Sequence, residues 1–157
     1  MILISHRGNI DSINPERENT HDYIDEAINS GYHVEIDIYY HEGKLWLGHD
    51  NPETVVKNEW LIDRTAKLFI HAKNHAALEH FLYNTNIPVF YHTIEPHVLI
   101  GNTELIWSHN LSEATSNSII PLLSEAEIQK ADDFRHVFGI CSDFVKNYAM
   151  QSVRISH

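Results

Sequence analysis

Four short polar motifs near the start of the chain contain side chains that can do chemistry. They are His6-Arg7-Gly8, Glu18-Asn19-Thr20, Glu35-Ile36-Asp37 and Gly48-His49-Asp50. Histidine exchanges protons near neutral pH, and arginine offers a planar fork of donors to a phosphate. Paired carboxylates suit a divalent cation. The combination predicts a site that handles phosphate and metal.

The acidic pair lies in an alternating segment, Val34-Glu35-Ile36-Asp37-Ile38. Alternation predicts a strand with its aliphatic side chains on one face and both carboxylates on the other. Residues two apart on a strand are roughly 7 Å apart at Cα, so both side chains can reach one ion. Two buried like charges are costly unless a cation neutralises them. The alternative is a strand face exposed to solvent.

Short apolar runs that end in polar residues predict the elements that position these motifs. Strands are expected at 2–4, 34–38, 44–47, 68–73, 89–92, 105–107, 119–123 and 137–141, with a hairpin turn at Gly43 that returns His49-Asp50 to the same end of the fold. Helices are expected from Asn19 or Thr20 to Gly31, over 75–83, from a Ser124/Glu127 capping box to about Ala131, and through Phe144, Tyr148 and Met150.

Strands that alternate with helices predict a parallel sheet with a site at the carboxyl ends of its strands. The 157 residues suit one domain, 1–157. A closed (β/α)₈ barrel usually takes about 200 residues or more, and the connectors 93–104 and 108–118 are too short or polar for full helices. The expected fold is therefore a compact TIM-barrel-like (β/α)₈ barrel with some helices missing or shortened.

The composition excludes several classes of partner. With 22 acidic and 11 basic residues the formal net charge is −11, which argues against binding to nucleic acid or anionic membranes. No apolar stretch is long enough to span a bilayer, and the first residues lack the pattern of a signal peptide. The single cysteine, Cys141, lies in an apolar run and suggests core filler in a reducing compartment. The expected location is the cytoplasm.

In this order, the four motifs resemble those of the glycerophosphodiester phosphodiesterase family, part of the phosphatidylinositol-phospholipase-C-like phosphodiesterases. The resemblance covers the first fifty residues well, Lys73 falls where the family has a lysine on its third strand, and 139–143 resembles its closing Gly-Ile-x-Thr-Asp strand. The resemblance implies a (β/α)₈-type barrel, a divalent ion such as Mg²⁺ or Ca²⁺, and hydrolysis of a phosphodiester by two histidines.

Two departures from the family pattern bear on the metal and the substrate. His71 stands where the family has the glutamate of a Glu-x-Lys motif, its third metal ligand, and a late Trp-Thr-Val-Asn-like strand is not evident. As a nitrogen ligand, His71 would favour Mn²⁺ or Zn²⁺ over Ca²⁺. It is equally well explained as a hydrogen-bonded core histidine. His92 and Trp107, at the ends of later strands, would line the pocket or pack in the core and rim.

Together these features predict a metal-dependent phosphodiester hydrolase acting on a small molecule. The expected roles are proton exchange by His6 and His49, phosphate binding by Arg7 and Lys73, metal binding by Glu35, Asp37 and His71, and orientation of these groups by Glu18 from outside the ligand set.

Two other readings compete with this one. A catalytically inactive barrel would bind a phosphorylated ligand or a sugar, and another metal-dependent hydrolase would act on neutral amides. Arg7 and Lys73 beside the acids favour phosphate. A homo-oligomer would cover apolar strand faces that missing helices leave exposed.

Overall fold

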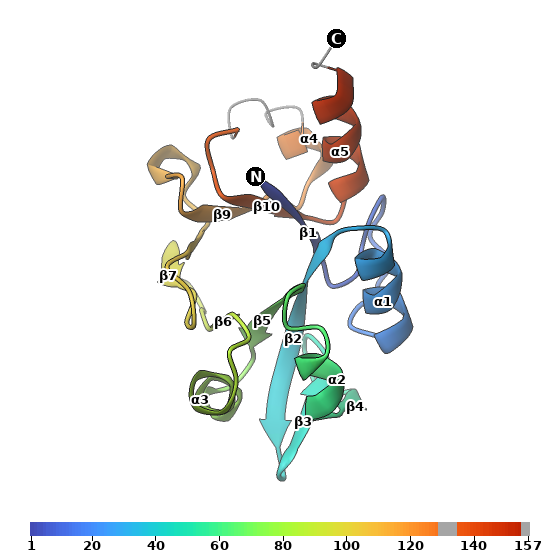
Figure 1. Ribbon diagram of the computed structural model, residues 1–157, viewed down its shortest axis with the longest axis vertical. Coiled ribbons are helices and arrows are strands. Elements are labelled where there is room, and N and C mark those ends of the chain that lie inside the picture. Colours follow the sequence, from blue (N-terminus) through green and yellow to red (C-terminus); the bar gives the residue numbers. More distant parts are fainter. Residues whose placement is uncertain (129–134, 155–157) are drawn as a thin grey trace.

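The computed structural model of the protein describes residues 1–128 and 135–154, in which ten strands form one mixed sheet (Figure 1). The strands are β1 (Ile2–His6), β2 (His33–His41), β3 (Lys44–Leu47), β4 (Thr54–Val56), β5 (Leu68–Ala72), β6 (Val89–Phe90), β7 (His97–Leu99), β8 (Ile106–Ser108), β9 (Ser118–Pro121) and β10 (Gly139–Ser142). The helices are α1 (His21–Asn29), α2 (Asn58–Ile62), α3 (His75–Asn84), α4 (Glu125–Ile128) and α5 (Val145–Arg154), with one 3-10 turn, η1 (Leu111–Glu113).

The centre of the sheet is parallel, as predicted. Strands β6, β5, β2, β1, β10, β9 and β8 pair side by side in parallel, whereas β3, β4 and β7 pair antiparallel at its margins. In Figure 1 the sheet curves around a centre and the helices lie outside it. The carboxyl ends of the parallel strands therefore meet at one rim.

The expectation of a complete barrel is not confirmed, because the sheet does not close over the described residues. Its two ends, β6 and β7, are joined by one antiparallel bridge between Val89 and Gly101, with N···O distances of 3.2 and 2.7 Å. Strand β6 contains only two residues, and the chain from Phe90 to His97 contains no helix. The facing edges are thus too short for a continuous ladder.

Most expected elements are present with shifted ends. The segments missed are β4, β7 and α2, each of five residues or fewer, which are too short to show a clear period. Helix α1 begins after Thr20, which makes no side-chain capping bond, so neither Asn19 nor Thr20 caps it through its side chain. Glu127 Oε2 accepts a hydrogen bond of 3.0 Å from the Ser124 amide, as the capping box predicts. The end expected for that helix, near 131, lies outside the described residues.

A buried cluster on the inner face of the sheet supports the rim. Its members include Ile4, Phe69, Phe90, Trp107 and Cys141, one each from β1, β5, the end of β6, β8 and β10. Cys141 is a free, fully buried thiol, which confirms its expected role as core filler. Other apolar clusters fill the space between the sheet and the outer helices. Among the described residues, no helix has the length and apolar character needed to cross a membrane.

Gly48 provides a test of how the β3 connection positions His49. Its φ is 148°, and a Cβ at this position would overlap the carbonyl oxygen of Asn51. Gly48→Ala is therefore expected to lower the free energy of unfolding by about 1–3 kcal/mol and to displace His49. Urea unfolding and the imidazole NMR signal of His49 would measure the two effects.

The control is Gly43→Ala, where φ is 74° and the space around the added Cβ is open. This change is expected to cost about 1–2 kcal/mol through the backbone alone and to leave the His49 signal in place. An unshifted His49 signal in Gly48→Ala would contradict the positioning role.

Candidate active site

The site is built by a repeated step along the strands. Because side chains alternate, a residue two positions after a core residue lies on the same face, nearer the carboxyl end. The inner-core residues Ile4, Phe69, Phe90, Trp107 and Cys141 are followed at this spacing by His6, His71, His92, His109 and Asp143. Five segments thus bring a histidine or an aspartate to the rim, above one apolar cluster.

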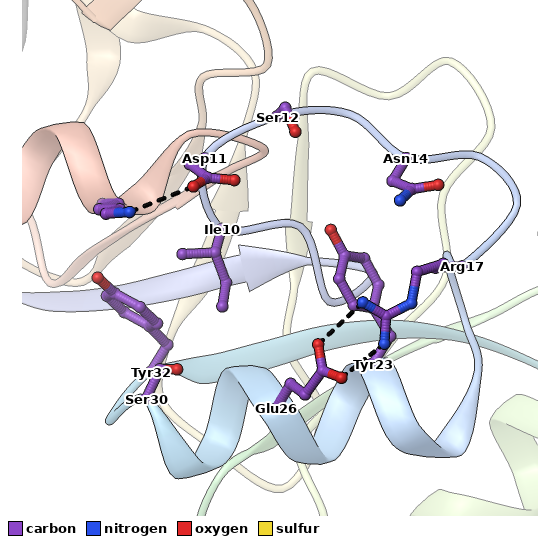
Figure 2. Close-up of a pocket in the computed structure, with 10 residues that line it drawn as sticks. Ile10, Asp11, Ser12, Asn14, Arg17, Tyr23, Glu26, Ser30 and Tyr32 are labelled. Atoms are coloured by element: carbon purple, nitrogen blue, oxygen red, sulfur yellow. Dashed lines mark hydrogen bonds and ion pairs between the residues drawn. The ribbon is translucent and has the colours of Figure 1, made fainter.

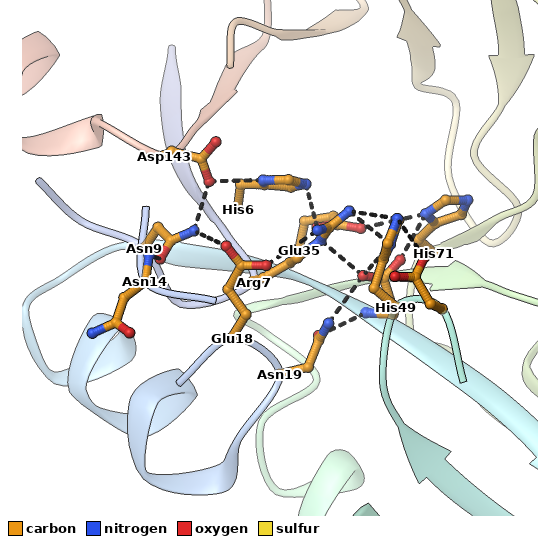
Figure 3. A network of polar contacts seen from close by, with 12 residues as sticks. His6, Arg7, Asn9, Asn14, Glu18, Asn19, Glu35, His49, His71 and Asp143 are labelled. Atoms are coloured by element: carbon orange, nitrogen blue, oxygen red, sulfur yellow. Dashed lines mark hydrogen bonds and ion pairs between the residues drawn. The ribbon is translucent and has the colours of Figure 1, made fainter. Parts of the chain in front are cut away.

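Strand β2 contributes both acids to this layer. Glu35 is 2% exposed and Asp37 is fully buried. The parallel pairing of β2 with β5 puts His71 opposite Asp37. The Nδ1 atom of His71 lies 3.0 Å from Asp37 Oδ1 and 3.7 Å from Glu35 Oε1. The three side chains bring ligand atoms close to one another, and Figure 3 shows Glu35 and His71 in the surrounding polar network.

The two oxygens of Asp37 have different surroundings. Oδ2 accepts a hydrogen bond of 3.0 Å from Asn19 Nδ2 and lies 2.9 Å from Arg7 Nε and 3.1 Å from His49 Nδ1. Oδ1 faces His71 and has no hydrogen bond of good geometry among the described residues, and the same holds for Glu35 Oε2. Oδ2 therefore takes most of the donor contacts, whereas Oδ1 has His71 Nδ1 at 3.0 Å and the Lys73 ammonium at 3.5 Å.

The two acids differ in electrostatic character. Burial and the charge of Asp37 raise the pKa of Glu35 above its ordinary value. Burial also acts to raise the pKa of Asp37, but the nearby imidazoles of His49 and His71 and the charge of Arg7 outweigh it and hold that pKa well below its ordinary value. Asp37 is the stable anion of the pair, and Glu35 is the acid that needs a positive neighbour.

A divalent ion fits this donor set. One ligand atom from each of Glu35, Asp37 and His71 can be chosen so that all lie within 4.8 Å of one another. The buried carboxylate oxygen of Glu35 without a hydrogen bond is the observation that favours the ion, because an unpaired buried charge is costly. Two carboxylates and one imidazole would hold the ion and leave its other positions for water or substrate.

Arg7 and Lys73 form the positive side of the site. Arg7 has a φ of 56°, in the left-handed region, and its amide donates to Glu35 O at 2.8 Å. Its guanidinium is held by Asp37 and by Glu18, whose Oε2 lies 3.1 Å from Nη1. Lys73 Nζ lies 3.5 Å from Asp37 Oδ1. Both cations are near enough to the acid pair to bind phosphate oxygens beside a metal ion.

His6 is fixed by a residue that sequence reasoning left out of the site. Asp143 Oδ1 lies 2.8 Å from His6 Nδ1 and accepts a second hydrogen bond, of 2.7 Å, from Asn9 Nδ2. The other ring nitrogen, Nε2, points toward Glu35 Oε2 at 3.8 Å. Burial lowers the pKa of His6, but the hydrogen bond to Asp143 and the charges of Glu35 and Asp143 raise it above the ordinary value.

His49 lies on the opposite side of Arg7, with its side chain 39% exposed. Its Nδ1 is 2.7 Å from Arg7 Nη2, 3.3 Å from Lys73 Nζ and 3.1 Å from Asp37 Oδ2. This nitrogen can accept from the cations or donate to the carboxylate, one arrangement at a time. Tyr39 donates a 3.0 Å hydrogen bond to His49 O and steadies the backbone.

All eight expected side chains lie in this one network, and their chemical roles stay predictions. Glu18 contacts Arg7 and Asn9. His92 stacks on His71, with ring centres 4.7 Å apart, whereas Trp107 is core. Asn9, Asn19 and Asp143 were missed. The position of Asp143 after an apolar strand was the available signal for it.

Two cavities border this region. One, of about 340 Å³, reaches Arg7 and His49 between the loops after β1 and β3. The other, of about 440 Å³, lies between the loop after β1 and helix α1 (Figure 2). The charged groups of the second cavity pair with one another, Arg17 with Glu26 and Lys146 with Asp11. The first cavity is the one lined by expected site residues, Arg7, Glu18 and His49.

Comparison with known proteins supports the fold. No family model matches the sequence, and no curated protein matches it significantly. A solved structure, the glycerophosphodiester phosphodiesterase from Agrobacterium tumefaciens str. C58, matches with a TM-score of 0.58 at 14% identity, over 95% of this chain and 99% of that chain. At this identity the likeness concerns the fold alone, which is a mixed α/β sheet similar to that of the TIM-barrel-like neighbour.

The raised pKa of Glu35 gives a test in the absence of divalent ions. A folded-state pKa above the unfolded value means that the folded protein binds more protons, so stability falls as pH rises from about 4.5 through the folded pKa. Glu35→Gln removes this loss. The free energy of unfolding in urea with a chelator should therefore favour the variant increasingly as pH rises.

Glu16→Gln, at an exposed acid, is the control and is expected to show no such trend. A Glu35→Gln variant whose stability relative to the wild type does not change with pH would contradict the electrostatic description of the pair.

Proposed function

We propose that this protein is a metal-dependent phosphodiester hydrolase of the glycerophosphodiester phosphodiesterase type. The observation that carries the proposal is that two histidines lie beside the buried acid pair, which with His71 fits a metal: His6 Nε2 is 3.8 Å from Glu35 Oε2, and His49 Nδ1 is 3.1 Å from Asp37 Oδ2. The fold similarity to a phosphodiesterase agrees with it. The metal, when bound, would supply positive charge to the phosphoryl oxygens and help to orient the diester.

The positive side chains bind the phosphate in this scheme. Arg7 offers a donor fork and Lys73 a single ammonium group to the phosphoryl oxygens that do not leave. When Arg7 and Lys73 turn to the phosphate, they no longer donate to His49 Nδ1. This nitrogen then donates a hydrogen bond to Asp37 Oδ2. Its other nitrogen, Nε2, is then set to exchange a proton.

His6 exchanges the second proton. Its Nδ1 donates to Asp143, which fixes the tautomer and leaves Nε2 on the metal-cluster side. One histidine removes a proton from the attacking oxygen and the other gives a proton to the leaving oxygen. A substrate hydroxyl next to the phosphate would make a cyclic phosphate first, and phosphorus NMR of the products distinguishes this route from direct hydrolysis by water.

Release of nitrophenolate from an aryl phosphodiester, with Mg²⁺, Ca²⁺, Mn²⁺ or Zn²⁺ in turn, tests the function. His6→Ala and His49→Ala are each expected to lower kcat by about 10²- to 10⁴-fold, because each removes a proton-transfer group. His80→Ala, a histidine stacked on Tyr40, is the matched control and should retain activity. No turnover with any ion, together with retained binding of a phosphate monoester, would instead favour the inactive, ligand-binding barrel.

The role of Asp143 is tested by Asp143→Asn. Removing this negative charge is expected to lower the pKa of His6, so the limb of the pH–rate profile due to His6 should move to lower pH and kcat should fall. Asp11→Asn, at an exposed acid paired with Lys146, should leave the profile unchanged. A full retention of kcat and of the profile in Asp143→Asn would exclude this role.

A further inference from the structure

His71 is the third residue of the candidate metal site formed with Glu35 and Asp37. Neighbouring aromatic rings fix the plane of its imidazole. The imidazole is nearly parallel to Phe90, at 5.0 Å between centres and 3°, and to His92, at 4.7 Å and 6°. Phe90 is 1% exposed and stacks in turn on buried Trp107, with centres 4.4 Å apart. The orientation of His71 is thus anchored in the inner core.

The atom of the His71 ring that faces the two acids is a nitrogen. Nδ1 lies near Asp37 Oδ1 and Glu35 Oε1, at 3.0 and 3.7 Å. An imidazole binds a metal in its own plane through a nitrogen lone pair, so the plane and the edge decide whether it can be a ligand. A histidine that only fills the core would not need its ring plane and its Nδ1 atom both directed toward two carboxylates.

From this geometry we propose that Phe90 and His92 are positioning residues that present His71 Nδ1 as a metal ligand, and that the site therefore selects ions that accept nitrogen over Ca²⁺ and Mg²⁺. This inference rests on the metal role of Glu35 and Asp37 in the proposed function. Among the described residues, the cluster offers two carboxylates and one imidazole. Ca²⁺ takes six to eight oxygens, whereas imidazole suits Zn²⁺, Co²⁺ and similar ions.

His92 also contacts a second histidine ring. His109 contacts it at 4.9 Å between ring centres, and the His109 amide donates to Pro96 O at 2.8 Å. The His92 ring is therefore contacted by the residue that follows β8, and that residue is itself bonded to the loop before β7. Removing the His92 ring should free His71 to turn while leaving both carboxylates in place.

Titration calorimetry with Co²⁺ and with Ca²⁺, and the visible absorption spectrum of bound Co²⁺, test the proposal without hydrolysis. The wild type is expected to bind Co²⁺ more tightly than Ca²⁺. His92→Ala should weaken Co²⁺ binding by about 10- to 100-fold and alter the spectrum, with little effect on Ca²⁺. His92→Phe, which keeps a flat ring, should restore both, and His71→Glu should reverse the preference.

The matched control is His80→Ala, which removes an imidazole stacked on Tyr40 and should leave Co²⁺ binding unchanged. Circular dichroism would check that each variant is folded, and if His92→Ala is not, His71→Glu alone decides through the ion preference. Equal or tighter binding of Ca²⁺ by the wild type, or an unchanged Co²⁺ spectrum in folded His92→Ala, would overturn the inference. Hydrolysis that depends on Ca²⁺ would overturn it while supporting the proposed function, and selective Co²⁺ binding without hydrolysis would do the opposite.

Discussion

Two carboxylates are buried side by side on one strand, and the other groups of the site compensate the cost of burying this negative charge. Glu35 and Asp37 on β2 lie within a few ångströms of His6, Arg7, His49, His71 and Lys73. Several donors contact one oxygen of Asp37, whereas Glu35 Oε2 has no hydrogen bond among the described residues and lies 3.8 Å from His6 Nε2. A divalent ion between Glu35, Asp37 and His71 would complete the neutralisation of these charges.

The backbone accepts strain to provide these donors. Arg7 and Asn19 both have φ near 56°, which is uncommon for residues other than glycine. Asn19 donates through Nδ2 to Asp37 Oδ2 and accepts through Oδ1 from the Asp37 amide. The two unusual conformations therefore point their side chains at the same carboxylate.

An open sheet is sufficient to assemble this site because the site residues lie at the carboxyl ends of the strands and in the loops that follow them. The apolar cluster below the rim spans β1, β5, the end of β6, β8 and β10, and it holds the site residues at a common height. The incomplete ladder between β6 and β7 lies on the side of His92 and His109. The family-like motifs lie on the opposite side, on β1, β2 and the loops that follow β1 and β3, where pairing is continuous.

Sequence patterns within a few residues predicted the local features of the site. Alternation around Glu35 and Asp37 indicated their common face, and the hairpin turn at Gly43 indicated that His49 returns to the rim. The partner of His6 could not be read in this way, because Asp143 is 137 residues away and the contact depends on the pairing of β1 with β10. Asparagine is a common helix cap, but the side chain of Asn19 bonds to Asp37 instead, because this satisfies the buried carboxylate and the Asp37 amide. Closure of the barrel depended on strand lengths that a short apolar run does not define.

The claim that Glu35, Asp37 and His71 form a metal site is tested most directly by anomalous diffraction from crystals soaked with Mn²⁺. The account predicts one anomalous peak within bonding distance of a carboxylate oxygen of Glu35, of Asp37 Oδ1 and of His71 Nδ1. A peak elsewhere only, or none between these three side chains at saturating Mn²⁺, would contradict it.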